Sequence, residues 1–209
     1  MGWFLTQNRF EQEPPPLEAL TAILQLATFL EMDVARSFAI HHLAAPTLGL
    51  SAARRLSLGL GYHITDWLEP AFQELICTPA CRITVEDFAQ LGMPVVHLIM
   101  ATQASVRCLR LAIAYNPLKP YRHDFTCKRA GCQSNWEMAW WDGLARHYLH
   151  PDLPTSPHET MEKLESNPII GVTEACQLNA IETIKEQRVF EREDDIIEKA
   201  LNALKAYVA

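Results

Sequence analysis

The stretch LEALTAILQLATFL, residues 17–30, decides the fold class of this chain. Its apolar residues recur at steps of three and four, which places them on one face of an α-helix. Similar segments follow along the 209 residues, separated by proline, glycine or a capping side chain, and none shows the alternation of a β-strand. The sequence therefore predicts an all-α fold, an irregular array of short helices stacked in pairs. The apolar face of this first segment consists of Leu17, Leu20, Leu24, Ala27 and Leu30.

Capping residues predict where several of these helices begin. Thr84, followed three residues later by Asp87, resembles a capping box. The run Ser156-Pro157-His158-Glu159 combines a hydroxyl cap, a proline at the first helical position and a glutamate three residues after the cap. Pro94 suits the first turn of a long helix that ends at about Tyr115.

Other boundaries depend on weaker signals. Asp33 is predicted to cap the second helix, and Asp194 or Asp195 to begin the last one. A continuous helix is predicted from about Gln133 to Leu149. Cys108 falls inside the long helix before it and is predicted to be a core residue.

Composition limits the classes of function. The net charge of -7 argues against a general nucleic-acid surface and against docking on anionic membranes. The longest apolar stretches are about half of the roughly 20 residues that a membrane span needs, and residues 1–5 lack the basic start of a secretory signal. We therefore expect a cytoplasmic or nuclear protein whose six cysteines are reduced thiols or metal ligands.

Several stretches carry a resemblance to a known family. The first half of the chain is similar to the back half of the BTB/POZ-domain proteins that are expanded in mushroom-type fungi. The stretches that carry this similarity are WFL (3–5), LQLATFL (24–30), ARSFAI (35–40), YHITDWLEPAF (62–72) and ITVEDFAQLG (83–92). Further along, the chain resembles the same family's C-terminal region at Cys127, Cys132, Trp136, Trp140-Trp141, His150-Pro151-Asp152 and Gly171 through Cys176.

This resemblance implies a domain organisation and a function. Residues 1–16 would be a remnant of the BTB sheet region with a Pro-rich linker, and 17–115 the BTB-closing and BACK-like helical region. Residues 116–209 would form a C-terminal helical subdomain with a candidate Cys/His metal site. The N-terminal BTB core, with most of its dimer-forming surface, is expected to be missing, which leaves the oligomeric state open. The implied function is a protein-interaction module that is not an enzyme, an adaptor or scaffold in ubiquitin-ligase or transcription-related assemblies.

The candidate metal site consists of His123, Cys127, Cys132 and Cys176. Thiolate and imidazole are the ligands that tetrahedral zinc prefers, and three of these residues lie within ten positions of one predicted loop. We expect a closed structural site that ties this loop to the C-terminal helices. The competing interpretation is a set of ordinary buried thiols and a surface histidine.

Two further functions remain open at this point. Cys127 or Cys132 could act as a nucleophile with His123 as its base, which would make the chain a cysteine-dependent enzyme. The basic cluster between Arg122 and Arg129 could bind nucleic acid, which the acidic net charge disfavours.

The aromatic residues supply candidate partner contacts. Trp136 and Trp140 share one helix face and are predicted to be core residues. Trp141 points elsewhere and is a candidate contact for a protein partner, because tryptophan often dominates binding energy at interfaces. Trp3 and Phe4 are the other two candidate partner-binding residues.

Overall fold

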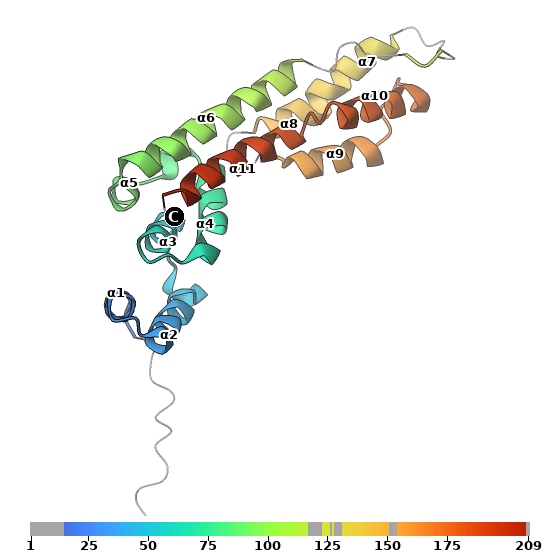
Figure 1. Cartoon of the computed structure of the whole chain (residues 1–209). Coiled ribbons are helices and arrows are strands. Elements are labelled where there is room, and N and C mark those ends of the chain that lie inside the picture. The colour runs from blue at the N-terminus through green and yellow to red at the C-terminus, as the bar shows by residue number, and fades with distance from the viewer. Residues whose placement is uncertain (1–14, 117–122, 126, 128–130, 151–153, 208–209) are drawn as a thin grey trace, which may run out of the picture.

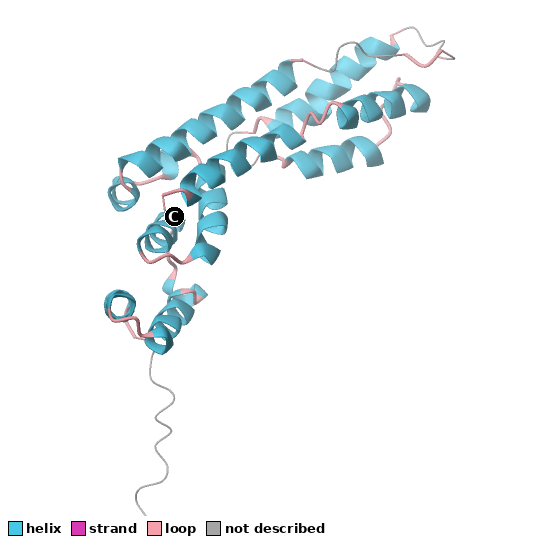
Figure 2. Cartoon of the chain, viewed as in Figure 1, coloured by secondary structure: helices cyan, strands magenta, loops and turns pink. Residues whose placement is uncertain are grey.

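The computed structural model describes residues 15–116, 123–125, 127, 131–150 and 154–207. Every regular element in these ranges is helical, which confirms the predicted all-α class (Figures 1 and 2). In chain order the elements are α1 (Leu17–Phe29), α2 (Asp33–Leu43), the 3₁₀ turn η1 (Pro46–Leu48), α3 (Ala52–Gly61), α4 (Thr65–Cys77), the 3₁₀ turn η2 (Ala80–Arg82), α5 (Val85–Leu91), α6 (Met93–Tyr115), α7 (Cys132–Ala139), the π-helical turn η3 (Trp140–Ala145), α8 (Arg146–Tyr148), α9 (Pro157–Ser166), α10 (Glu174–Glu186) and α11 (Glu191–Lys205).

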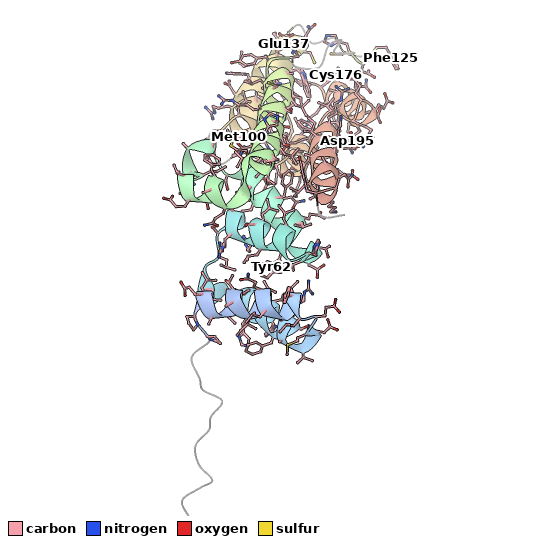
Figure 3. The ribbon with its side chains drawn as sticks, turned by 60° about the vertical axis from the view of Figure 1, so that its left-hand side comes forward. Tyr62, Met100, Phe125, Glu137, Cys176 and Asp195 are labelled. Atoms are coloured by element: carbon pink, nitrogen blue, oxygen red, sulfur yellow. The ribbon has the colours of Figure 1, made fainter. Side chains whose placement is uncertain are left out.

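The described helices form an elongated stack (Figures 1 and 3). The α1–α2 hairpin lies at one end, α3 to α5 follow it, and α7 to α10 lie at the other end. The long helix α6 and the last helix α11 run side by side and join the middle of the stack to the far end. No helix of the described residues, α6 included, is long and apolar enough to cross a membrane.

The α1–α2 hairpin has a small core of its own. Leu20 and Leu24 on α1 pack against Ala39 and Leu43 on α2, as the periodicity of residues 17–30 predicts. The prediction for Asp33 is wrong, because this residue is the first of α2 and the preceding residue makes no side-chain cap.

A second cluster joins the middle helices to the C-terminal end of the chain. Leu56 on α3 and Phe72 on α4 lie in the same cluster as Leu201 and Leu204 on α11. Helices from both sides of the predicted boundary at residue 115 therefore share one core. Close approach of α3 and α4 depends on Gly59, where a Cβ atom would lie 3.0 Å from Leu68 Cδ2.

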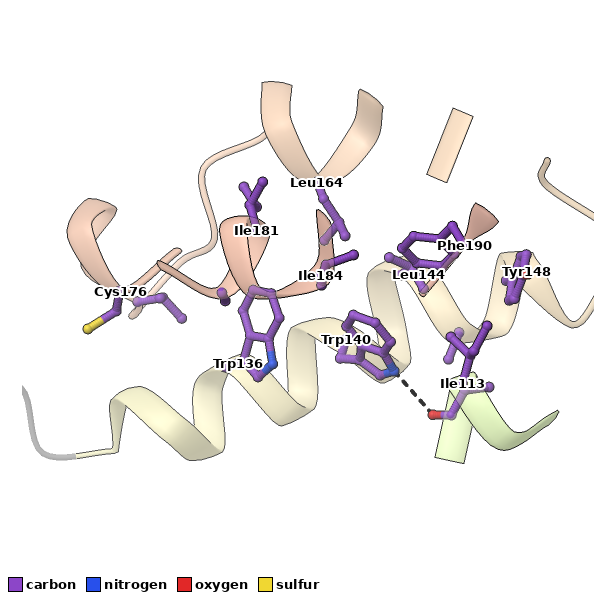
Figure 4. Packing of buried hydrophobic residues seen from close by; sticks show 14 of the residues in the cluster. Ile113, Trp136, Trp140, Leu144, Tyr148, Leu164, Cys176, Ile181, Ile184 and Phe190 are labelled. Atoms are coloured by element: carbon purple, nitrogen blue, oxygen red, sulfur yellow. Dashed lines mark hydrogen bonds between the residues drawn. The ribbon is translucent and has the colours of Figure 1, made fainter. Parts of the chain in front are cut away.

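The largest aromatic residues fill a third cluster, between α6, α7, η3, α8 and α10 (Figure 4). Trp136 and Trp140 are almost fully buried, which confirms the core prediction for both. Their ring centroids lie 5.9 Å apart, and Trp140 also stacks on Phe190. The Trp140 indole donates a hydrogen bond of 3.2 Å to the backbone oxygen of Ala114, so its polar atom is satisfied inside the core.

Three sequence predictions in this half need correction. The predicted helix over residues 133–149 is continuous but widens into a one-turn π-helix at η3, which periodicity cannot reveal because both helices bury a similar face. The last helix begins at Glu191, before Asp194 and Asp195. Cys108 is exposed, because it lies on a face of α6 that none of the other described helices covers.

Candidate metal centre

The four predicted ligand residues come together at the far end of the stack. The ligand atoms of His123, Cys127, Cys132 and Cys176 all lie within 4.8 Å of one another. Two sulfur atoms bound to one zinc at about 2.3 Å with tetrahedral geometry would lie roughly 3.8 Å apart. The cluster therefore has the composition and the size of a four-ligand structural zinc site.

Two of these ligands are positioned by the N-terminal ends of helices. Gly131 precedes α7 with a φ of 85°, in the left-handed region that glycine adopts without strain. The chain thereby enters α7 with Cys132 as its first residue. Cys176 lies in the first turn of α10, where the N-cap Thr173 accepts a hydrogen bond of 3.4 Å from the Cys176 backbone N–H.

The surroundings of Cys176 favour its thiolate form. Burial of the thiol opposes ionisation, but hydrogen bonds from Thr173, from the backbone of Asp124 and from the side chains of His123 and Cys127 outweigh it. Together they lower the Cys176 pKa to about 6. The Asp124 N–H donates to Cys176 Sγ at 3.3 Å, and His123 Nδ1 lies 4.0 Å from the same sulfur. Thiolate is the form in which cysteine binds a metal.

Burial distinguishes a structural site from a reactive one. Cys132 and Cys176 are fully buried at the edge of the aromatic cluster, Cys127 is half-buried, and only His123 is exposed. Cys132 and Cys176 belong to that cluster, so a bound ion would join the segment at 123–127 to the starts of α7 and α10. A cavity of about 390 Å³ lies beside the cluster, and its lining includes His123 and Cys132.

The predicted partner-binding residues have different outcomes. Trp141, on η3, keeps 42% of its surface exposed and packs on the exposed Tyr115, with ring centroids 5.5 Å apart. Its contact with a partner stays a prediction. Trp3 and Phe4 lie outside the described residues, as do the basic side chains of Arg122, Lys128 and Arg129.

The sequence analysis missed a group of exposed apolar side chains on the α1–α2 hairpin, which we call the hairpin patch. Phe29 and Val34 are 82% and 87% exposed. Leu30, assigned to the buried face from its spacing, lies beyond the end of α1 and is exposed as well. The sequence does carry an indication of this patch, because α1 and α2 contain more apolar residues than their buried faces can hold. The hairpin patch consists of Leu26, Phe29, Leu30, Met32, Val34 and Phe38.

Comparisons with known proteins do not assign this chain to a family. No family model matches it, and searches of curated proteins and of solved structures found no significant match. The similarity to BTB/POZ proteins therefore rests only on the stretches of sequence quoted above.

Proposed function

We propose that this chain is a helical protein-interaction module whose C-terminal half is held together by a structural zinc ion. The hairpin patch carries the interaction part of this proposal. Six large apolar side chains close together in sequence stay exposed at one end of the stack. Contiguous exposed apolar surface is costly in water and commonly marks a site where a protein partner binds.

The position of the hairpin patch supports this role. Four of its members, Phe29, Leu30, Met32 and Val34, lie where α1 ends and α2 begins. The hairpin itself lies at one end of the stack, so a partner could reach it without disturbing the cores of the other helices. Phe38 at its edge also contacts His42, with ring centroids 4.3 Å apart. An apolar partner surface would remove these side chains from water, which favours binding by roughly 25 cal/mol for each Å² buried.

Cross-linking from the hairpin patch tests the interaction. A photoreactive residue in place of Phe29 is expected to cross-link one partner in cell extract, and the same residue in place of the exposed Val85 on α5 is the matched control. Adding Val34→Asp to the Phe29 variant should abolish the cross-link, because a charge would be buried in an apolar interface. Equal cross-linking from both positions, or insensitivity to Val34→Asp, would contradict the proposal.

The zinc ion would act as a staple in this module. Three thiolates and one imidazole would fill its coordination sphere, which is the pattern of a closed structural site. The ion would fix the segment at 123–127 against the starts of α7 and α10. Because thiols are deprotonated when they bind, part of the binding free energy would stabilise the folded state.

Elemental analysis of the purified protein tests the staple. We expect about one equivalent of zinc, lost in Cys176→Ser because a fully buried ligand is removed. Cys108→Ser, which alters an exposed thiol on α6, should retain the metal. Protein that is metal-free after purification in zinc-containing buffer, with a stability that chelator leaves unchanged, would discard the staple.

The biological setting that we propose is that of a fungal BTB-like adaptor or scaffold in ubiquitin-ligase or transcription-related assemblies. The resemblance of residues 62–72 and 83–92 to the BTB/POZ family supports it. Identification of the cross-linked partner as a component of either assembly would support this setting, and a partner unrelated to both would remove it.

The alternative is a cysteine-dependent enzyme that uses Cys127 or Cys132 with His123. A ring nitrogen of His123 lies within 4.8 Å of both sulfur atoms, which favours it, because a thiol near an imidazole is the pattern of an activated nucleophile. Against it, Cys132 and Cys176 are inaccessible to solvent. Stoichiometric labelling of one cluster cysteine by a thiol probe at neutral pH would favour the enzyme, whereas inert cysteines with bound zinc would favour the scaffold.

A further inference from the structure

A cavity lies between η3 and α9, on the side of the C-terminal helices, and shares no residue with the metal cluster. Its volume is about 500 Å³, within the range of sites that bind small molecules. One wall comes from α7, η3 and His147 of α8, and the other from α9 and residues 167–170. The cavity shares no residue with the hairpin patch either.

Apolar side chains make up most of the cavity lining, and the polar side chains among it are Asn135, His147, Thr155, Thr160 and Asn167, besides the charged Asp142 and Lys163. Leu144 and Leu164 line the cavity and are buried. Both also belong to the aromatic cluster, where Figure 4 shows them. Thr160 lies one helical turn before Leu164 and is 2% exposed. Its Oγ1 atom has no hydrogen-bond partner among the described residues. A buried hydroxyl without a partner is unfavourable, so this position lacks a polar group that a ligand could supply.

The mouth of the cavity carries two opposite charges. Asp142 on η3 and Lys163 on α9 are both exposed, and neither forms an ion pair with a described residue. They place one charge of each sign at the mouth. Met138 and Ile170, the latter 95% exposed, add apolar surface to the mouth.

Gly143 keeps the η3 wall open. A Cβ atom at this position would have no neighbour within 4 Å, and its φ is not positive, so neither packing nor backbone geometry requires glycine here. Glycine inside a helix weakens the helix relative to alanine. The glycine also lies within a π-helical turn, a feature that is frequent at functional sites.

We propose that this cavity binds a mostly apolar small organic molecule with a polar atom that hydrogen-bonds the Thr160 hydroxyl. The apolar part of the lining would enclose the body of the ligand. Thr160 would rotate about its Cα–Cβ bond to meet the polar atom, and thereby gain the partner that the protein itself does not provide.

Binding of 6-propionyl-2-(dimethylamino)naphthalene tests this site, because this fluorophore is neutral, apolar and carries one carbonyl acceptor. The full-length protein should bind it with a blue-shifted emission. Gly143→Leu should weaken binding at least tenfold by filling the cavity, whereas Gly61→Leu, at another glycine with no neighbour within 4 Å, should bind as the wild type does. Thr160→Val should weaken binding about fivefold, as expected for one hydrogen bond.

The inference is overturned if the wild type does not bind the probe up to its solubility limit. It is also overturned if Gly143→Leu and Gly61→Leu bind it equally, because the probe would then lie elsewhere, for example on the hairpin patch. If Gly143→Leu does not fold, as judged by circular dichroism, Gly143→Met takes its place with the same expected loss. Equal binding by Thr160→Val would remove the proposed polar contact.

Discussion

At the scale of single residues, the buried contact between Arg110, Glu193 and Tyr148 joins α6, α11 and α8. Arg110 Nε and the Tyr148 hydroxyl each donate to Glu193 Oε2 at 2.8 Å, and the guanidinium lies 5.0 Å from the Tyr148 ring centroid. The side chains of Arg110 and Glu193 are only 15% and 5% exposed. Each of the two charges can therefore stay buried only while the other is paired with it, because an unpaired buried charge is strongly unfavourable.

This dependence predicts the effect of removing one partner. Glu193→Ala should lower the free energy of unfolding by about 3–5 kcal/mol, because Arg110 would remain buried without its carboxylate. The double variant Arg110→Met with Glu193→Met should recover much of this loss, since no buried charge remains. Urea unfolding measures both, and a loss below about 1 kcal/mol for Glu193→Ala would contradict the burial argument.

The same contact predicts how stability changes at high pH. Burial, the charge of Glu193 and the hydrogen bond to it raise the pKa of Tyr148 above its usual value, although Arg110 partly opposes them. The unfolded chain releases this proton above about pH 10 while the folded protein keeps it, so the stabilisation is complete below that pH and is lost above it. We expect the wild type to lose more stability than Tyr148→Phe between about pH 10 and 11, by up to roughly 1.4 kcal/mol per pH unit. If the free energy of unfolding falls equally with pH in the wild type and in Tyr148→Phe, the raised pKa of Tyr148 is contradicted.

At the scale of elements, capping decides where α9 begins. The Ser156 hydroxyl accepts from the Glu159 N–H at 3.2 Å, and the Glu159 carboxylate accepts from the Ser156 N–H at 3.1 Å. This complete capping box was predicted from the sequence, as was that of Thr84 and Asp87 in α5. It could be predicted because both partners lie within four residues of each other.

Loss of this cap should have a measurable cost. Ser156→Ala is expected to lower the free energy of unfolding by about 1 kcal/mol, because the Glu159 N–H in the first turn of α9 loses its acceptor. Ser166→Ala, at the other end of the same helix, is the control and should be neutral or slightly stabilising. Thermal unfolding of the two variants separates them, and equal changes would show that the cap contributes nothing specific.

At the scale of the whole molecule, metal removal should affect one end of the stack. Chelator is expected to increase amide hydrogen exchange in α7 and in the first turns of α10, because their relative position would depend on the zinc ligands Cys132 and Cys176. The helices α1 and α3 share no core residue with that end and should exchange at an unchanged rate. Mass spectrometry resolves these peptides, and a uniform increase along the chain would contradict a local staple.

The sequence by itself determined the helical class, most helix starts and the four candidate ligands. These features depend on interactions between residues a few positions apart, such as the spacing of Leu20 and Leu24 or the cap at Ser156, and such short-range patterns are visible in a linear chain. The ligands were identifiable because few side chains bind zinc.

Only the tertiary structure decided what depends on distant contacts. Cys176 and His123 are 53 positions apart, and Arg110 and Glu193 are 83 apart, so nothing local reports how they meet. The hairpin patch, the exposed face of Cys108 and the cavity at Gly143 are likewise set by which surfaces the other helices cover. Helical periodicity states that a residue faces one side, but the packing of the whole chain decides whether that side is buried or meets water.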